Sequence, residues 1–182
     1  AGVFPALDDL LPWFAARQGK NRATFGGNLG SASPIGDLLP WLLALDAVIE
    51  LAGPGGRRVL PADGYFLAYR KTARLEDELV VAVRVPRHGG IEAGYKVAKR
   101  QADDISIVAA VYRIELDGAR RVRLARLAYG GVAATPVRAT AVEGFLLGRE
   151  WHADTVEAAA QALESAFTPF DDHRASAAYR RA

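Results

Sequence analysis

The sequence predicts an α+β protein built around antiparallel sheet. Three observations support this class. Short apolar runs are separated by Gly and Pro in residues 47–60, longer strand-like runs cover residues 91–130, and helical spacing of apolar residues appears after residue 135. Strands that follow one another and are then followed by helices indicate an antiparallel layer. A chain of 182 residues with 51% apolar side chains can form one large or two small domains.

Residues 7–18 predict the first helix. Their apolar side chains recur three and four residues apart, as one face of a helix requires. These side chains are Leu7, Leu10, Leu11 and Phe14. The helical spacing continues on both sides of Pro12, so the prediction covers the whole range.

A segment rich in glycine and small polar side chains follows, over residues 21–40. Gly26, Gly27 and Gly30 permit positive φ, so we expect the backbone to bend sharply and offer N–H groups to a polar ligand. Short hydrogen-bonding side chains lie on the same segment at Thr24, Asn28, Ser31 and Ser33. An ordinary glycine-rich connection has the same composition and is the alternative.

Residues 38–46 predict a short helix that should be buried, because nearly all of its side chains are apolar. Ser33 and Pro34 are typical of a helix start. Asp37 would then lie in the first turn, where a carboxylate suits the positive end of the helix dipole.

The next elements are predicted to be strands. Residues 47–52 and 57–60 form a hairpin in this interpretation, because Gly53-Pro-Gly-Gly56 separates two apolar runs. Residues 78–85 alternate in part and end at Pro86, which indicates a further strand.

A boundary between two units is predicted at residues 86–90, where Pro, His and two glycines interrupt all periodicity. The predicted domains are therefore residues 1–88 and 89–182. In the second unit, the predicted strands are residues 91–99, 105–116 and 122–130, with a turn at Asp117-Gly118, and the predicted helices are residues 135–147 and 154–167.

Composition excludes several classes of function. With 23 basic and 21 acidic side chains the net charge is +2, which does not indicate a nucleic-acid partner. No apolar run approaches the ~20 residues that cross a bilayer and no signal peptide is visible, so we expect a cytoplasmic protein without membrane contact. The absence of cysteine excludes disulfides, thiolate-bound zinc and iron–sulfur clusters in this chain.

No catalytic side chain or metal site is predicted. The histidines, His88, His152 and His173, do not have the spacing of metal ligands. The sequence contains no Gly-x-Gly-x-x-Gly or Walker motif and no Ser–His–Asp order that indicates a nucleophile.

The order Ala-Thr-Phe-Gly-Gly-Asn over residues 23–28, followed by Ser-Pro-Ile-Gly-Asp-Leu-Leu-Pro over residues 33–40, resembles the second flavin-contacting segment of the xanthine dehydrogenase family's FAD domain. More segments are similar to that family, in its order and at compatible spacing. They are residues 13–18, 65–72, 95–105, 129–132 and 171–180. The resemblance covers most of the chain and is closest to the small, separately encoded bacterial subunit.

The resemblance implies an architecture. Residues 1–88 correspond to the C-terminal part of a two-subdomain FAD-binding domain, and residues 89–182 to the flavoprotein C-terminal domain of molybdenum hydroxylases, truncated at its end. The family's cysteine-rich domain and upstream Gly-rich FAD segment are missing, and the sequence contains no methionine. We therefore expect a fragment that retains only some of the FAD contacts.

The resemblance also implies which residues contact FAD. Phe14 and Ala15 match a pair that lies against the cofactor, with the ring near the adenine, and Val80 matches an aliphatic residue in the adenine region. Residues 24–28 match the segment that touches the phosphates and the ribityl chain. The expected FAD-binding residues are Phe14, Ala15, Thr24, Phe25, Gly26, Gly27, Asn28, Ser31, Asp37, Val80 and Lys96. Core packing is the alternative for Phe14 and Val80.

Two charged residues have specific roles by resemblance. Asp37 contacts the flavin's ribityl chain, and the Lys96 ammonium near the isoalloxazine favours the reduced flavin. The alternatives are a helix-terminal carboxylate and a solvated lysine. Tyr69, Asp103 and Asp104 are expected to shape access of NAD to the flavin, whereas a plain turn is the alternative for the two aspartates.

The function implied is an FAD-binding electron-transfer module of a xanthine dehydrogenase-like oxidoreductase. It would pass electrons from 2Fe-2S clusters through FAD to NAD⁺ during purine hydroxylation at a molybdopterin cofactor. Expected partners are a large molybdenum subunit and an iron–sulfur domain in a hetero-oligomer. The alternatives are the flavoprotein of a carbon monoxide dehydrogenase-like or nicotinate-type hydroxylase, oxygen as the acceptor, and an assembly module that docks onto the molybdenum subunit.

Overall fold

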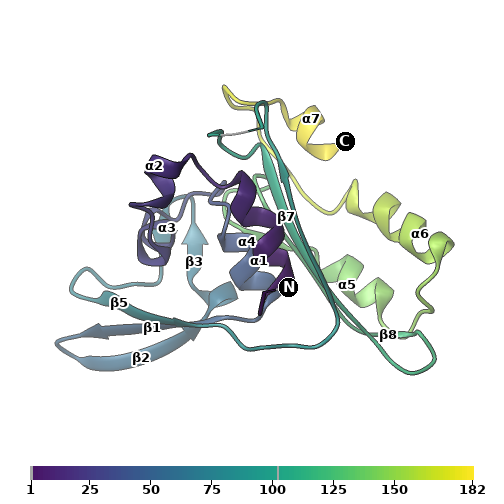
Figure 1. Ribbon diagram of the computed structural model, residues 1–182, viewed down its shortest axis with the longest axis horizontal. Coiled ribbons are helices and arrows are strands. Elements are labelled where there is room, and N and C mark those ends of the chain that lie inside the picture. Colours follow the sequence, from purple (N-terminus) through teal and green to yellow (C-terminus); the bar gives the residue numbers. More distant parts are fainter. Residues whose placement is uncertain (1, 102) are drawn as a thin grey trace.

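The computed structural model describes residues 2–101 and 103–182. Its strands form a three-stranded sheet in the order β2–β1–β5, a small β3–β4 hairpin and a four-stranded sheet in the order β6–β7–β8–β9. Helices pack around both larger sheets, whose strand pairs are all antiparallel (Figure 1). The predicted α+β class is therefore confirmed.

The chain begins with short helical pieces where one helix over residues 7–18 is predicted. α1 covers Pro5–Leu10, a 3₁₀ turn (η1) follows at Leu11–Trp13, and α2 covers Arg17–Lys20. The break lies at Ala15, whose φ of 47° is left-handed and has no place in a right-handed helix. The prediction of one continuous helix is wrong for this reason.

A helix forms where the glycine-rich segment predicts a sharply bent backbone. α3 covers Phe25–Ser31, and the Thr24 side chain caps it by accepting a hydrogen bond of 2.9 Å from the backbone N–H of Gly27. None of the three glycines in α3 has a positive φ, so that prediction is wrong. The left-handed residue is Ala32, with a φ of 42° directly after the helix.

The buried helix predicted over residues 38–46 is present as α4, Leu39–Ala44, and all six of its residues are buried. It begins two residues after Asp37, with Leu38 as its N-cap and a proline in its first turn. Asp37 therefore does not lie in the first turn of the helix, contrary to the prediction. Its carboxylate points instead to partners far along the chain, described below.

The strands of the first sheet match the sequence pattern. The elements are β1 (Val48–Gly53), β2 (Gly56–Pro61) and β5 (Leu79–Arg84), with η2 (Ala62–Gly64), β3 (Phe66–Ala68) and β4 (Lys71–Thr72) between them. The β1–β2 hairpin turns at Gly53–Gly56, as predicted, and β5 pairs with the other edge of β1.

The second sheet contains the three predicted long strands and one short strand. The strands are β6 (Ile91–Val97), β7 (Val108–Leu116), β8 (Val122–Gly130) and β9 (Val137–Arg138), and the helices are α5 (Thr140–Leu146), α6 (Ala153–Leu163) and α7 (Ala177–Arg181). The helix predicted over residues 135–147 is wrong at its start, because residues 137–138 pair with β8 before α5 begins.

Helices cover both faces of the four-stranded sheet. α1 and α4 contact one face, and α5 packs on the other through β8, with α6 packed against α5 (Figure 1). Val111 of β7 and Ala128 of β8 belong to the same apolar core as α4 and β1, while their sequence neighbours Ala110 and Leu127 belong to the α5–α6 core. The alternation of strand side chains thus gives the sheet two cores.

α1 lies directly on β6 at Gly94. A Cβ atom at this position would overlap the backbone carbonyl oxygen of Ala6 and the side chain of Leu10. The Gly94 backbone N–H also donates to the Asp9 carboxylate at 3.1 Å. This close approach fixes the first helix beside the strand that carries Lys96.

Candidate functional site

The ammonium of Lys96 is the centre of a buried polar cluster. Its side chain is only 4% exposed. It donates hydrogen bonds to the Asp37 carboxylate at 2.8 Å and to the backbone carbonyls of Asp104 at 2.7 Å and Trp13 at 3.1 Å. The other Asp37 oxygen accepts a hydrogen bond from the Ser106 hydroxyl at 2.5 Å. One lysine therefore joins β6 to three other segments of the chain.

Gly94 of β6 faces α1, and side chains two residues apart in a strand lie on the same face. Lys96 is therefore on the face of β6 that α1 covers. All three of its ammonium protons have protein acceptors. Its influence on a ligand would therefore come from its fixed charge rather than from another hydrogen bond. The solvated-lysine alternative is wrong, since the side chain is buried in an ion pair.

The loop after β6 is tied to the cluster by two aspartates. The Asp104 carboxylate accepts from the backbone N–H groups of Ile105 at 2.9 Å and Arg100 at 2.8 Å. The hydrogen bond from Ile105 is the main reason that the pKa of Asp104 lies below its usual range, against the opposing effect of burial. Asp103, which has a left-handed φ of 51°, accepts from the backbone N–H of Ala16 at 3.1 Å.

α3 brings an unsatisfied acceptor next to this cluster. The side-chain oxygen of Asn28 is buried and has no hydrogen-bond partner. A Cβ atom at Gly36 would lie 3.2 Å from that oxygen, so the Asn28 amide sits beside the residue that precedes Asp37. A buried acceptor without a donor is uncommon and suits a ligand hydroxyl or amine.

The start of α3 is also open to a polar ligand. The first backbone N–H groups of any helix lack acceptors within it, and here they belong to Phe25 and Gly26. A Cβ atom at Gly26 would meet nothing within 4 Å. Ser31, at the other end of α3, is exposed and donates to the Asn28 carbonyl at 2.9 Å. The N–H groups of Phe25 and Gly26 can donate to phosphate oxygens, and the unpaired Asn28 oxygen can accept from a hydroxyl of a nucleotide cofactor.

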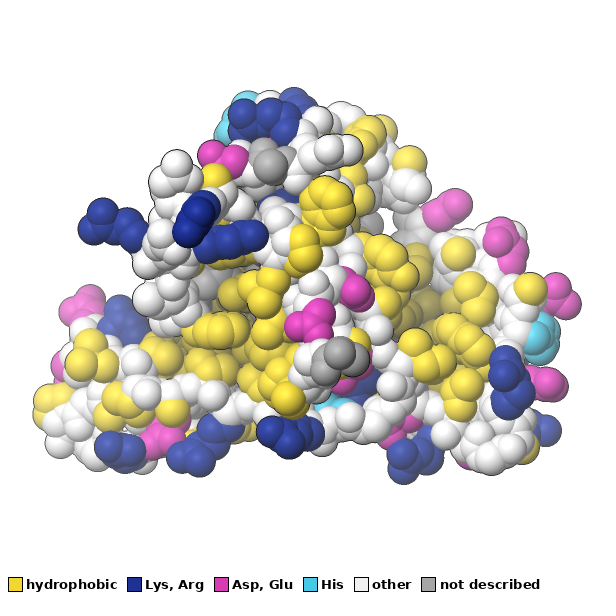
Figure 2. Space-filling view, in the orientation of Figure 1, with side chains coloured by type: hydrophobic (Ala, Val, Ile, Leu, Met, Phe, Trp, Pro, Cys, Tyr) yellow, Lys and Arg dark blue, Asp and Glu magenta, His cyan; other side chains and the backbone are white. Residues whose placement is uncertain are grey.

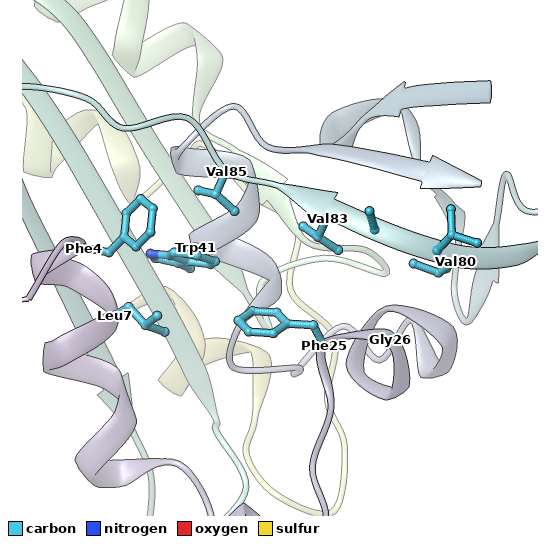
Figure 3. Close-up of a pocket in the computed structure, with 10 residues that line it drawn as sticks. Phe4, Leu7, Phe25, Gly26, Trp41, Val80, Val83 and Val85 are labelled. Carbon is cyan, nitrogen blue, oxygen red and sulfur yellow. The ribbon is translucent and has the colours of Figure 1, made fainter. Parts of the chain in front are cut away.

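An apolar groove of about 420 Å³ adjoins the start of α3. Phe25, Gly26 and Val80 line it together with Phe4, Leu7, Trp41 and Val81, Ala82, Val83 and Val85. Figure 3 shows the Phe25 and Trp41 rings among these side chains, with Phe4 and Leu7 at one end and Val80 at the other. The centroids of the two rings are 5.9 Å apart. Hydrophobic side chains gather in the same region on the molecular surface (Figure 2). The volume of the groove is typical of a site for a small molecule.

The expected FAD residues thus fall into separate groups. Phe25, Gly26 and Val80 share the groove, whereas Asp37 and Lys96 form the ion pair. Phe14 and Ala15 do not line the groove: they lie in the turn after η1, next to Trp13, whose carbonyl bonds Lys96. The resemblance places Phe14 and Val80 near one adenine; of the two, only Val80 lines this groove.

Tyr69 does not share a cavity lining with Asp103 and Asp104, the other two residues expected to shape NAD access. Its side chain is 57% exposed and lines a cavity of about 400 Å³, beside Ser33, Pro34 and Ile35. Arg70 and Arg174 also line this cavity, whereas Asp103 and Asp104 do not. The segment 33–37 contributes to both places, because residues 33–35 line the cavity and Asp37 pairs with Lys96.

Two residues of the site were missed by sequence reasoning. Ser106 is fully buried and holds Asp37, yet it is one small residue after a resembling segment and gives no pattern of its own. Trp41 lies inside an all-apolar helix, which predicts core packing, but its buried indole nitrogen has no partner and its ring lines the groove.

No group of metal-ligating side chains was found within the described parts of the chain. Among the described helices, none has the length and hydropathy needed to cross a bilayer.

Comparison with protein families matches the chain in two stretches. Residues 1–88 match the FAD binding domain in molybdopterin dehydrogenase, and residues 93–182 match the CO dehydrogenase flavoprotein C-terminal domain.

Similar proteins agree with these matches. Xanthine dehydrogenase of Blastobotrys adeninivorans is 38% identical over 98% of this chain, which spans 13% of that protein. The glyceraldehyde dehydrogenase medium chain of Sulfolobus acidocaldarius is 35% identical over 90% of this chain, which spans 58% of it. Carbon monoxide dehydrogenase from Hydrogenophaga pseudoflava, solved without the Mo-pyranopterin moiety, superposes with a TM-score of 0.90 at 32% identity, covering 97% of this chain and 61% of that one.

Proposed function

The chain belongs to the flavoprotein family of molybdenum hydroxylases, which includes xanthine dehydrogenases, and we propose that it binds FAD and transfers electrons within a xanthine dehydrogenase-like oxidoreductase. The observation that carries this proposal is the convergence on Asp37. The Lys96 ammonium pairs with the Asp37 carboxylate, and the unpaired Asn28 oxygen lies beside Gly36, the residue before Asp37.

The start of α3 would bind the phosphates of FAD. Its free N–H groups at Phe25 and Gly26 are directed along the helix axis, and the helix dipole favours negative charge there. Thr24 holds the helix start in shape through its bond to Gly27. The adjoining groove, with Val80 on its wall, would take an apolar or aromatic part of the cofactor.

Asp37 and Asn28 would bind the ribityl chain. A carboxylate has about four acceptor sites, and Ser106 and Lys96 use only two of those on Asp37. The remaining sites and the Asn28 oxygen can accept from sugar-alcohol hydroxyls. Phe14, Ala15 and Ser31 remain proposed FAD contacts.

Lys96 would set the electrostatic field at the flavin. When bound, the flavin ring accepts electrons from a donor and delivers them to an acceptor. Because Asp37 and two carbonyls fix the ammonium, its positive charge stays at one position and favours a ring that has gained electrons.

NAD is the acceptor that the second cavity supports. Arg70 and Arg174 line it, and guanidinium groups suit the two phosphates of a dinucleotide. The exposed Tyr69 ring offers a face for a base or nicotinamide. Asp103 and Asp104 would act at a distance, by holding the loop that borders the flavin. Oxygen, the alternative acceptor, needs neither the volume nor the charges.

Partners would supply the rest of the electron path. The described chain has no cysteine, so iron–sulfur clusters must be held elsewhere, and the molybdenum cofactor would belong to a large subunit in a hetero-oligomer. The Sulfolobus relative is named as a medium chain. Purine is the proposed substrate class, because the Blastobotrys relative is a xanthine dehydrogenase.

A carbon monoxide dehydrogenase-like flavoprotein is the second candidate. The superposition on the Hydrogenophaga protein, with a TM-score of 0.90, favours it at the level of fold. Sequence identity favours the first candidate, since 38% with a xanthine dehydrogenase exceeds 32% with the carbon monoxide enzyme.

The electron acceptor can be tested by mixing FAD-loaded protein with NADH without oxygen and following the visible flavin absorbance. Loss of that absorbance is expected, and it should slow in Tyr69→Ala but not in Tyr179→Ala, a control with an equally exposed ring. Protein that binds FAD but is not reduced by NADH would contradict the NAD proposal. A colourless protein that still captures the molybdenum subunit would instead favour an assembly module.

A further inference from the structure

Arg180 of α7 is a buried cation at the wall of the second cavity, and the proposed FAD contacts do not include it. Its side chain is 1% exposed. One terminal nitrogen donates to the backbone carbonyls of Ile107 at 2.8 Å and Gly131 at 2.7 Å, and the other donates to the Asp172 carboxylate at 2.7 Å. A cation buried to this degree is costly, so its bonds hold segments that must stay together.

The segments joined by Arg180 are those that position Asp37. Ile107 directly follows Ser106, whose hydroxyl bonds one Asp37 oxygen at 2.5 Å. The backbone N–H of Gly131 donates to the Pro34 carbonyl at 2.7 Å, three residues before Asp37. Arg180 thus holds both the partner of the carboxylate and the segment that carries it.

Gly131 shows how closely these segments approach. Its φ is 89°, and a Cβ atom there would overlap the Ile107 carbonyl oxygen and lie 3.0 Å from the Arg180 terminal nitrogen. Only glycine fits this position without displacement of the backbone. The junction leaves no room for another side chain beside the guanidinium.

We propose that Arg180 is a positioning residue for the FAD site, acting on the Asp37 carboxylate through Ile107 and Gly131. The inference rests on the proposed FAD function. Arginine suits this role because its planar fork reaches two carbonyls and a carboxylate at fixed angles, whereas lysine offers a single nitrogen. The segment 171–182 lines the second cavity but not the groove, and through Arg180 it would also position the FAD site.

The test is a double-mutant cycle on FAD affinity. Flavin fluorescence gives the FAD dissociation constant of the protein, Arg180→Lys, Asp37→Asn and the double variant, and urea unfolding gives their stabilities. Arg180→Lys is expected to raise the dissociation constant roughly 10-fold, as substitution of residues that orient a ligand group does. In the Asp37→Asn background the same change should be less than about two-fold, because the two residues act as a unit.

Arg181→Lys is the matched control. It makes the same chemical change on the same helix at an exposed position and should leave the FAD dissociation constant unchanged. If Arg180→Lys does not fold, Asp172→Asn replaces it, since it weakens one of the three bonds and keeps the two carbonyl bonds.

The possible results distinguish the positioning role of Arg180 from the proposed FAD function. A loss of affinity that disappears in the Asp37→Asn background supports the positioning role. An equal loss in both backgrounds shows that Arg180 acts through general stability, and no loss shows that it does not act on the site; either overturns the inference. If this protein binds no FAD, the same titration is made on the chain extended upstream through the Gly-rich FAD segment. A folded extended chain that also binds no FAD refutes the proposed function and the inference together, before any variant is made.

Discussion

The hydrogen-bond partners of Asp37 are brought to it by the tertiary structure. Its two partners, Lys96 and Ser106, lie 59 and 69 residues away in sequence. Resemblance identified Asp37 and Lys96 separately, but no pattern in the sequence indicates that they form a buried ion pair. The pairing depends on the register of β6 against β7 and on the path of the segment before α4, which only the tertiary structure fixes.

Removal of the Lys96 charge should destabilise the protein. Lys96→Met leaves the Asp37 carboxylate buried without its cation, and we expect the free energy of unfolding to fall by about 3 kcal/mol. Urea denaturation followed by circular dichroism measures this change. Lys99→Met, at an exposed position three residues away, should change stability by less than about 0.5 kcal/mol. Equal stability of both variants would contradict the structural role of the ion pair.

Asn28 should behave in the opposite way. Because its side-chain oxygen has no protein partner, Asn28→Ala removes no hydrogen bond of that oxygen and should keep the free energy of unfolding or raise it by up to about 1 kcal/mol. FAD affinity should nevertheless fall several-fold. Fluorescence titration and urea denaturation of the same sample separate the two effects, with the exposed Asn21→Ala as control. A clear loss of stability with unchanged affinity would show that Asn28 is structural.

At the scale of elements, the strands were easier to predict than the helices. The β1–β2 hairpin and β5 follow from apolar runs between Gly and Pro, and the structure confirms them. α3 was missed because its three glycines favour a turn, although Thr24 is a typical N-cap residue and could have indicated a helix start. β9 was missed because two residues are too few to show alternation.

The contact between α1 and β6 gives a prediction for these elements. Gly94→Ala places a methyl group against the Ala6 carbonyl, so the helix must shift, and we expect a loss of roughly 2 to 3 kcal/mol in the free energy of unfolding. Gly118→Ala is the control, because a Cβ atom there meets nothing within 4 Å. Urea midpoints compare the two. A Gly94 variant as stable as the control would contradict the close packing of α1.

The ion pair between β2 and the turn before β5 predicts a pH dependence. The Arg58 side chain, with help from the Leu75 N–H, lowers the pKa of Glu78 from 4.5 to about 2. A carboxyl with a depressed folded-state pKa stabilises the protein above its unfolded pKa, and this contribution is lost as the pH falls from 4.5 toward 2. The urea midpoint of Glu78→Gln should therefore lie below that of the unsubstituted protein at pH 6, and the gap should narrow at pH 3. A constant gap would contradict this assignment.

At the scale of the whole molecule, the apolar pattern predicted the fold class, whereas the resemblance predicted the flavin function. Apolar patterning anticipated the α+β class and most strands, because Gly and Pro separate the apolar runs that form them. The flavin interpretation came from ordered segments such as residues 23–28 and 33–40, whose chemistry is not visible in periodicity. The shared core, in which Val111 and Ala128 of the second sheet pack with α4, could not be predicted, since it depends on how the two sheets meet.

The measurement that tests the central claim most directly is a fluorescence titration of the protein with FAD, beside Asp37→Ala and the exposed control Asp77→Ala. The account predicts saturable binding that Asp77→Ala keeps and Asp37→Ala weakens by about 10- to 100-fold, the value of hydrogen bonds to a charged group. Urea denaturation confirms that each variant is folded. Two results would contradict the account: Asp37→Ala that binds FAD as tightly as the unsubstituted protein, or absence of FAD binding both in this chain and in one extended upstream through the Gly-rich FAD segment.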